Sequence, residues 1–186
     1  AVVDNTREGV AVCADSPWAM RVAARYHGPI LSYGFSQDAM LRAENIRCTA
    51  EESRFTLLHG SNHLAEVTLP IPGRHNIANA LGAMAACMLL GMNASALANA
   101  LSQACAELPK RRFQWLTPQT APIRVVVDYA HHPTEIQAML SIARLQKPKR
   151  MRVVFQPHRY SRTKKLLPEF VPAFEDVDEL ILMPVY

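Results

Sequence analysis

The sequence lacks an apolar run long enough to cross a membrane as a helix. Its longest apolar run, residues 80–92, is interrupted by Gly82 and Gly91, and a bilayer requires roughly 20 residues. The N-terminus shows no signal-peptide pattern, and the chain begins with Ala1 rather than Met. We therefore expect a stretch excised from a longer protein.

Cysteine is scarce, and its spacing argues against a disulfide framework. The four cysteines stand far apart and form no Cys-x-x-Cys: they are Cys13, Cys48, Cys87 and Cys105. Such isolated cysteines are typical of proteins from a reducing compartment. The sequence therefore predicts reduced thiols and a cytoplasmic protein.

Three common chemical signatures are also missing. There is no Gly-x-Gly-x-x-Gly, no phosphate-binding Gly-x-x-x-x-Gly-Lys-Ser/Thr loop and no nucleophile elbow. The net charge of +4 and a pI near 9.0 favour anionic ligands weakly. Because no basic stripe interleaves with aromatic residues, a nucleic-acid-binding module is the weakest hypothesis. The chain is predicted to be the part of an enzyme that holds substrates.

The first part of the chain predicts an α/β arrangement followed by a small antiparallel meander. A strand at residues 10–14, a helix from Ser16-Pro17 to about Tyr26 and a strand at residues 30–33 suggest a parallel crossover. The meander follows, with strands at residues 42–48, 54–58 and 65–69. Two packed helices complete this part, at residues 76–90 and 93–106.

The second part predicts an incomplete Rossmann-like domain with a parallel sheet. We place the domain boundary near Leu108, which gives domains at residues 1–108 and 109–186. Strands are expected at residues 113–116, 123–128, 152–156 and 179–183. Helices are expected at residues 133–145 and 163–174. This alternation of strands and helices indicates the α/β class.

Two loops that follow strands carry most of the specialised polar residues. One is Asp128-Tyr129-Ala130-His131-His132-Pro133-Thr134-Glu135, and the other is residues 155–163, with His158, Arg159 and Arg162. Successive strand-to-helix loops meet at one edge of a parallel sheet, where open α/β sheets bind ligands. We therefore expect both loops to lie side by side in a binding site.

The residue types in these loops suit an anion. Arg159 and Arg162 precede a predicted helix, whose N-terminus carries unpaired N–H groups and a positive dipole. Glu135 can close a capping arrangement with its own loop. Adjacent histidines at a turn are poor zinc ligands, so no metal site is predicted. A simpler reading remains open, in which these residues are helix caps and surface arginines.

Two further motifs lie outside these loops. His75 can cap the helix that follows, and Asn76 and Asn79 are three residues apart, so they share one helix face. A pair of carboxamides can bind the edge of a purine. Arg112, in Arg111-Arg112 at the predicted domain junction, can reach a phosphate. Simple capping and a solvated linker are the alternatives.

Taken together, these motifs resemble the Mur ligases, the ATP-dependent amide ligases of peptidoglycan precursor synthesis. The resemblance covers nearly the whole chain, from Cys13-Ala14-Asp15-Ser16-Pro17 onward. Other matching segments are Tyr33-Gly34-Phe35-Ser36, Arg42-Ala43-Glu44-Asn45-Ile46, Gly73-Arg74-His75-Asn76 with Asn79, and Arg111-Arg112-Phe113. The two polar loops are the most specific part, and they match the family members that add L-alanine to UDP-N-acetylmuramate.

The resemblance implies a role for each candidate residue. His75, Asn76 and Asn79 would contact the adenine of ATP, and Arg112 would reach its phosphates. Asp128 would hold the ribose or order the nucleotide side. The substrate side would be lined by Tyr129, His131, His132, His158, Arg159 and Arg162. The cofactors would be ATP and Mg²⁺, with the metal ligands outside this stretch. The first domain would be part of the family's central ATP-binding domain, and the second part of its C-terminal domain.

The chain also departs from the family pattern. Family members usually carry two aspartates before the tyrosine, and here Val127 stands in the first place. Because the phosphate loop and the metal ligands are absent, we expect the stretch alone to be inactive. Two alternatives stay open: a sibling ligase that attaches a recycled murein peptide to the same nucleotide sugar, and a non-catalytic nucleotide- or anion-binding module.

Overall fold

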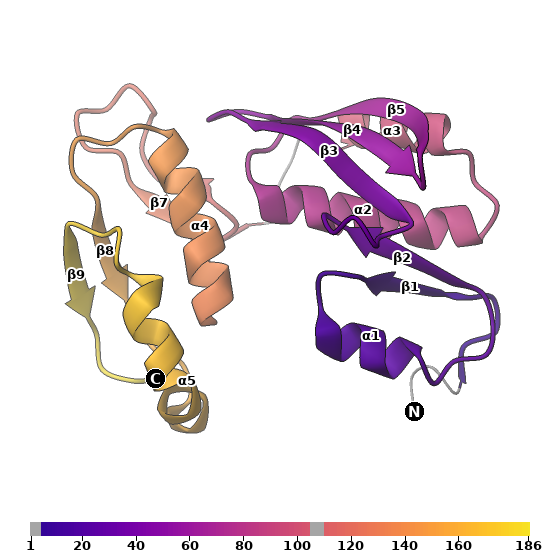
Figure 1. Cartoon of the computed structure of the whole chain (residues 1–186). Helices are drawn as coiled ribbons and strands as arrows, with labels where there is room; N and C mark the ends of the chain where they lie inside the picture. The colour runs from indigo at the N-terminus through magenta and orange to yellow at the C-terminus, as the bar shows by residue number, and fades with distance from the viewer. Residues whose placement is uncertain (1–4, 105–109) are drawn as a thin grey trace. The chain divides into compact units, whose positions relative to one another are not determined.

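The computed structural model describes residues 5–104 and 110–186 (Figure 1). Contacts divide the chain into two compact units, residues 1–107 and 108–186. The predicted boundary near Leu108, the predicted helix end at Ala106 and Cys105 lie outside the described residues. None of the described helices has the length and hydropathy needed to cross a bilayer.

The first unit contains a single five-stranded sheet in the order β1-β2-β3-β4-β5. Its strands are β1 (Val10–Cys13), β2 (Ile30–Gly34), β3 (Leu41–Cys48), β4 (Ser53–His59) and β5 (Asn62–Leu69). The first three strands pair in parallel, and β3, β4 and β5 pair antiparallel. The predicted crossover and meander are therefore confirmed, and the structure joins them into one sheet through the parallel pairing of β2 with β3.

Helix α1 (Pro17–Ala23) is shorter than the sequence predicted. The Ser16 hydroxyl accepts a hydrogen bond from the Ala19 N–H, which confirms Ser16 as its N-cap. The N–H groups of Arg25 and Tyr26 bond back three residues rather than four, so the helix ends in a tight turn before Tyr26. Figure 1 shows α1 and α2 on opposite sides of β1.

Helix α2 (Arg74–Leu89) supplies one side of the first unit's apolar core. Its Ile77, Leu81 and Met84 are almost fully buried and belong to the same cluster as Phe55 and Leu57 of the sheet. Gly91 follows the helix with φ 84°, a conformation that favours glycine and suits the end of a helix. Helix α3 (Ala94–Ala104) packs mainly on β5.

The second unit holds two small sheets and two helices. Strands β6 (Gln114–Trp115) and β7 (Val126–Val127) form an antiparallel pair, and β8 (Arg152–Phe155) and β9 (Glu179–Leu182) form a parallel pair. Helices α4 (Pro133–Leu145) and α5 (Tyr160–Ala173) pack on each other. Their apolar core contains Ile136, Leu140, Met151, Phe155, Phe170 and Ala173.

Two predictions for this unit need correction. The sequence placed the second and third strands in one parallel sheet, but β7 pairs with β6, and β8 pairs with β9, among the described residues. Helix α5 begins at Tyr160 rather than Thr163. Arg159, with φ 68°, makes the abrupt turn into the helix. Arg162 therefore lies in the first turn of α5 instead of before it.

Candidate functional site

The predicted nucleotide residues of the first unit lie at the start of α2. Gly73 is the N-cap, with φ 108°, and no side chain caps the helix. His75, which the sequence suggested as a cap, therefore does not occupy the N-cap position and lies within the first turn. The Asn76 carboxamide nitrogen donates to the Pro72 carbonyl at 2.7 Å. Asn79, one turn further along, is exposed.

Asp15 supports the approach to this helix, a role that the sequence did not reveal. Its two carboxylate oxygens accept the N–H groups of Phe35 and Ser36, each at 2.8 Å. Gly34 allows this approach, because a Cβ there would lie 2.5 Å from the Asp15 carboxylate. The Phe35 ring in turn stacks under the Arg74 guanidinium at 3.9 Å. The available signal was an aspartate at the end of β1 beside a Gly-Phe-Ser turn at the end of β2.

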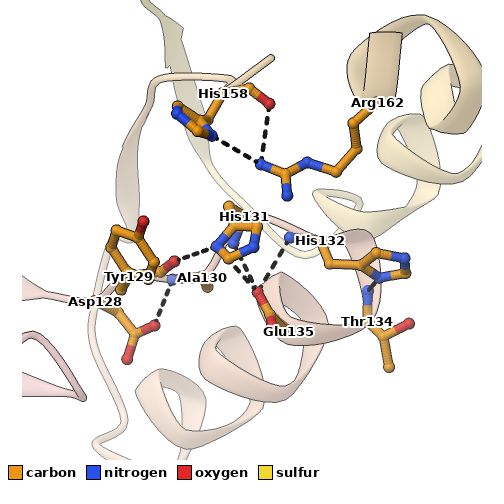
Figure 2. A network of polar contacts seen from close by, with 9 residues as sticks. All are labelled: Asp128, Tyr129, Ala130, His131, His132, Thr134, Glu135, His158 and Arg162. Atoms are coloured by element: carbon orange, nitrogen blue, oxygen red, sulfur yellow. Dashed lines mark hydrogen bonds and ion pairs between the residues drawn. The ribbon is translucent and has the colours of Figure 1, made fainter. Parts of the chain in front are cut away.

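Glu135 organises the first polar loop of the second unit (Figure 2). Its Oε2 atom accepts the N–H groups of His131 and His132 at 2.9 and 3.2 Å. The Nδ1 of His132 accepts the Thr134 N–H at 3.3 Å, which completes a capping box at the start of α4. The predicted capping role of Glu135 is confirmed, and Pro133 occupies the first helical turn as expected.

The environment of Glu135 stabilises its ionised form. Burial raises the pKa of the carboxyl, but several other contributions lower it and prevail. These are the His131 amide, the positive charge that His131 can carry, the His132 amide and the charge of Arg112. The net pKa lies below the ordinary value of 4.5. The loop therefore encloses a persistent negative charge.

Two histidines of the site have different protonation at Nδ1. His131 Nδ1 lies 2.9 Å from the Tyr129 carbonyl, which can only accept, so this nitrogen carries a proton. His158 Nδ1 lies 3.3 Å from Arg162 Nη2, which can only donate, so this nitrogen carries none. In this contact the Nδ1 of His158 is the acceptor, which leaves its Nε2 to contact a ligand.

Arg162 is fixed by the loop that precedes it, as Figure 2 shows. Besides its contact with the His158 ring, Nη2 donates to the His158 carbonyl at 2.9 Å. Its Nε is buried and has no hydrogen-bond partner in the described part of the chain. A buried guanidinium nitrogen without a partner favours an acceptor from outside the protein. The neighbouring Arg159 side chain is exposed.

A pocket of about 400 Å³ brings the two loops together. It is lined by His132, Arg159, Ser161, Arg162, Lys165 and Leu166. Three of these residues carry a full positive charge and none a negative one, so the pocket suits an anion. The sequence analysis did not single out Lys165. It lies three residues after Arg162, and this helical spacing was the signal that could have placed both on one face.

Asp128 and Arg112 lie near the β6–β7 hairpin. The carboxylate of Asp128 accepts the Phe113 N–H at 2.8 Å and the Ala130 N–H at 2.7 Å. Arg112 is exposed, and Tyr129 has 52% of its surface exposed. The Tyr129 ring lies edge-on to His131, with the two ring centroids 5.1 Å apart. These residues therefore share the end of the unit that carries Glu135.

The predicted nucleotide-side residues of each unit carry groups that can bind part of a nucleotide. Asn76 and Asn79 can bind a base, and the guanidinium of Arg112 can bind a phosphate. Mg²⁺ prefers several oxygen ligands gathered at one place. Within residues 5–104 and 110–186, no group of three or more His, Cys, Asp or Glu side chains is placed to hold a metal.

Two sequence families match the chain. Residues 2–87 match the Mur ligase middle domain, and residues 111–185 match the family described as Mur ligase, glutamate ligase domain.

Curated relatives share the likeness over most of the chain. The chain is 43% identical over 177 residues to the UDP-N-acetylmuramate–L-alanine ligase of Oleidesulfovibrio alaskensis, and this match covers 94% of the chain and 38% of the relative. It is 41% identical over 180 residues to the enzyme of the same name from Desulforapulum autotrophicum, covering 96% of the chain and 39% of the relative. The chain thus spans less than half the length of these relatives.

A solved structure supports the same likeness. The UDP-N-acetylmuramate–alanine ligase of Thermotoga maritima superposes with a TM-score of 0.77 at 26% sequence identity. The match covers 100% of this chain and 39% of that one. The α/β fold predicted from the sequence is therefore confirmed.

Proposed function

Because the chain belongs to the Mur ligase family, we propose that its protein joins L-alanine to UDP-N-acetylmuramate with ATP as the energy source. The observation that carries this proposal is the pocket of Arg159, Arg162 and Lys165 beside His132. A cationic pocket of this kind suits the carboxylate of a small amino acid. Relatives with more than 40% identity that bear this activity in their names support the same choice.

In the proposed reaction, the lactyl carboxylate of the sugar attacks the γ-phosphorus of ATP, an acyl phosphate forms, and ADP leaves. The neutral amine of alanine then attacks the acyl carbon, the C–N bond forms, and the bond from that carbon to the phosphate oxygen breaks, so inorganic phosphate leaves with the bonding electrons. The nitrogen gives one proton to the surrounding water and keeps the other as the amide N–H. Mg²⁺ would neutralise the transferring phosphoryl group, as in other phosphoryl transfers. We expect its protein ligands outside this stretch; within the described residues, no group of three or more His, Cys, Asp or Glu side chains is placed to hold a metal ion.

Residues of both units take part in this proposal. On the nucleotide side, His75, Asn76 and Asn79 of the first unit serve the base. In the second unit, Arg112 serves the phosphates and Asp128 orders the nucleotide side. On the substrate side, the Nε2–H of His158 and the guanidinium groups of Arg159 and Arg162 bind the alanine carboxylate. The remaining substrate-side residues are Tyr129, His131 and His132, which line the loop around Glu135.

A cytoplasmic location is part of the same proposal. The cysteines within the described residues (Cys13, Cys48 and Cys87) are all free thiols. Free thiols of this kind are typical of a reducing compartment.

The test measures phosphate release from ATP by the protein expressed from its complete reading frame. UDP-N-acetylmuramate is supplied with L-alanine, without an amino acid, or with the tripeptide of recycled murein. We expect release that depends on L-alanine. Arg162→Ala should raise the KM for L-alanine by about 10- to 100-fold, because a charge-assisted pair of hydrogen bonds is lost.

The matched control is Arg144→Ala, which removes an exposed arginine in the last turn of α4, outside the pocket. The KM of this variant for L-alanine should stay within about twofold of the KM of the protein without substitutions. Release with the tripeptide alone would transfer the assignment to the recycling ligase. Release with neither substrate would leave a binding module.

A further inference from the structure

We propose that Asp128 is a positioning residue for Arg112. Its carboxylate holds the turn at residues 111–113 so that the Arg112 guanidinium is presented to a polyphosphate. This inference rests on the proposed function and deepens it, because the motif by itself suggested that Asp128 holds the ribose or orders the nucleotide side and did not indicate which residue it acts on. In the structure, the Asp128 carboxylate accepts the N–H of Phe113, the residue that follows Arg112.

The turn around Arg112 has an unusual backbone. Arg111 has φ 61° and Phe113 has φ 44°, so both neighbours of Arg112 adopt a left-handed conformation. Residues with a side chain seldom adopt this conformation, because their Cβ meets the backbone. Two such residues, one on each side of an exposed arginine, need partners that hold them in place.

The segment that follows β7 supplies those partners. Asp128 Oδ2 accepts the Phe113 N–H at 2.8 Å, and the Tyr129 N–H donates to the Arg111 carbonyl at 2.8 Å. A third contact lies within the turn itself, where the Arg111 N–H donates to Gln114 Oε1 at 2.9 Å. The backbone is therefore tied down on both sides of Arg112, while its own side chain stays exposed.

The second oxygen of Asp128 fixes the carboxylate itself. Oδ1 accepts the Ala130 N–H at 2.7 Å, a contact drawn in Figure 2. One carboxylate thus bridges the turn at 111–113 and the polar loop at 128–135. Only an ionised carboxylate can accept at both positions through two equivalent oxygens. An isosteric asparagine would keep one acceptor and place an NH₂ group against the other N–H.

The charge around the turn agrees with a polyphosphate ligand. Lys110, Arg111 and Arg112 are consecutive and exposed. The positive charge of Arg112 is one of the causes that lower the pKa of Glu135, so the guanidinium lies within electrostatic reach of the polar loop. A guanidinium on a fixed backbone loses less freedom when it binds a phosphate bidentately.

The experiment compares ATP with inorganic tripolyphosphate, which has no ribose. Affinities are measured by calorimetry on the protein from its complete reading frame, with Asp128→Asn, Arg112→Ala and the double variant. We expect Arg112→Ala to weaken both ligands about tenfold or more. Asp128→Asn should weaken the binding of ATP and of tripolyphosphate by a similar factor of about three to ten. In the Arg112→Ala background, the same substitution should weaken binding by less than about twofold.

Amide hydrogen exchange at Phe113 gives a readout that needs no ligand. Asp128→Asn should accelerate exchange at this amide, whereas Arg112→Ala should leave it protected. Asp178→Asn is the matched control, because the Asp178 carboxylate also accepts a backbone N–H, from Met151 at 2.6 Å. It should change neither the Phe113 exchange nor the affinity for tripolyphosphate.

Several results would overturn the proposal. Loss of affinity for ATP but not for tripolyphosphate would show a direct ribose contact. Additive losses in the double variant, or unchanged exchange at Phe113, would show that Asp128 and Arg112 act independently. If the protein without substitutions binds neither ATP nor tripolyphosphate, the proposed nucleotide site is overturned as well. Affinities for ATP and tripolyphosphate that are both unchanged by Asp128→Asn would overturn this inference alone.

Discussion

At the scale of single residues, the carboxylate of Glu135 accepts two backbone N–H groups and also closes the capping box of α4. This role could be predicted from the sequence, because the partners lie within four residues of each other. The role of Asp128 could not, because its partner Phe113 is 15 residues away. Spacing along the chain does not reveal which turn will be folded against which loop.

Glu135→Gln tests the charge at this position. We expect the free energy of unfolding at pH 7 to fall by about 1 kcal/mol, since the amide oxygen is a weaker acceptor for two N–H groups. The folded-state pKa of Glu135 is lowered. The extra stability is therefore present above the unfolded pKa and is lost as the pH falls through the folded value. Chemical denaturation at pH 7 and near pH 3 measures this.

Glu169→Gln is the control, because Glu169 is an exposed carboxylate of α5. It should change the unfolding free energy by less than about 0.5 kcal/mol at either pH. If Glu135→Gln lowers the unfolding free energy as much near pH 3 as at pH 7, then the shape of the side chain, and not its ionisation, determines its contribution.

At the scale of elements, the structure shows where local signals are sufficient. The bounds of α4 match the prediction because His132, Pro133 and Glu135 form a self-contained start signal. The start of α5 was placed too late, because Arg159 enters the left-handed region and no side chain caps the helix. The pairing of β7 with β6 was missed because strand partners are determined by contacts that are distant in sequence.

Helix α3 covers the edge strand β5, a feature that no sequence pattern predicted. Strand β5 lies at the edge of the sheet, so its outer carbonyls have no neighbouring strand. Ser102 Oγ donates to the Thr68 carbonyl at 2.7 Å, and Ser95 Oγ donates to the Leu64 carbonyl at 3.4 Å. The two serines are seven residues apart and therefore lie on the same face of α3.

Ser102→Ala should lower the free energy of unfolding by about 1 kcal/mol, because the Thr68 carbonyl loses its donor. Ser141→Ala in α4 is a suitable comparison, since the Ser141 hydroxyl donates to the Ala138 carbonyl of its own helix at 2.7 Å. It should have a smaller effect. Thermal denaturation of the two variants distinguishes them, and equal losses would argue against a role for Ser102 in docking α3.

At the scale of the whole molecule, the chain has two separate apolar clusters, one in each unit. Leu81 is fully buried in the first cluster, and Leu140 is 7% exposed in the second. The site residues are divided in the same way, because His75, Asn76 and Asn79 lie in the first unit and the others in the second. Each set therefore depends on the core of its own unit for its geometry.

Leu81→Ala should destabilise the first unit by about 2 to 5 kcal/mol, because it leaves a cavity in a packed core. We expect faster amide exchange in α2 and β4 and unchanged exchange in α4. Leu140→Ala should give the converse pattern and serves as the reciprocal control. Exchange measured by mass spectrometry reports both, and simultaneous loss of protection in the two units would contradict separate cores.

The β6–β7 hairpin limits where the chain can change in length. Gln114 pairs with Val127 and Trp115 with Val126, and the Leu116 N–H donates to the Val125 carbonyl. Residues inserted at the hairpin tip, around residues 118–122, would lengthen a surface loop at little energetic cost. One residue inserted into either strand, between Phe113 and Leu116 or between Val125 and Asp128, would shift the register of the pair. The Asp128 carboxylate would then turn away from the turn at residues 111–113.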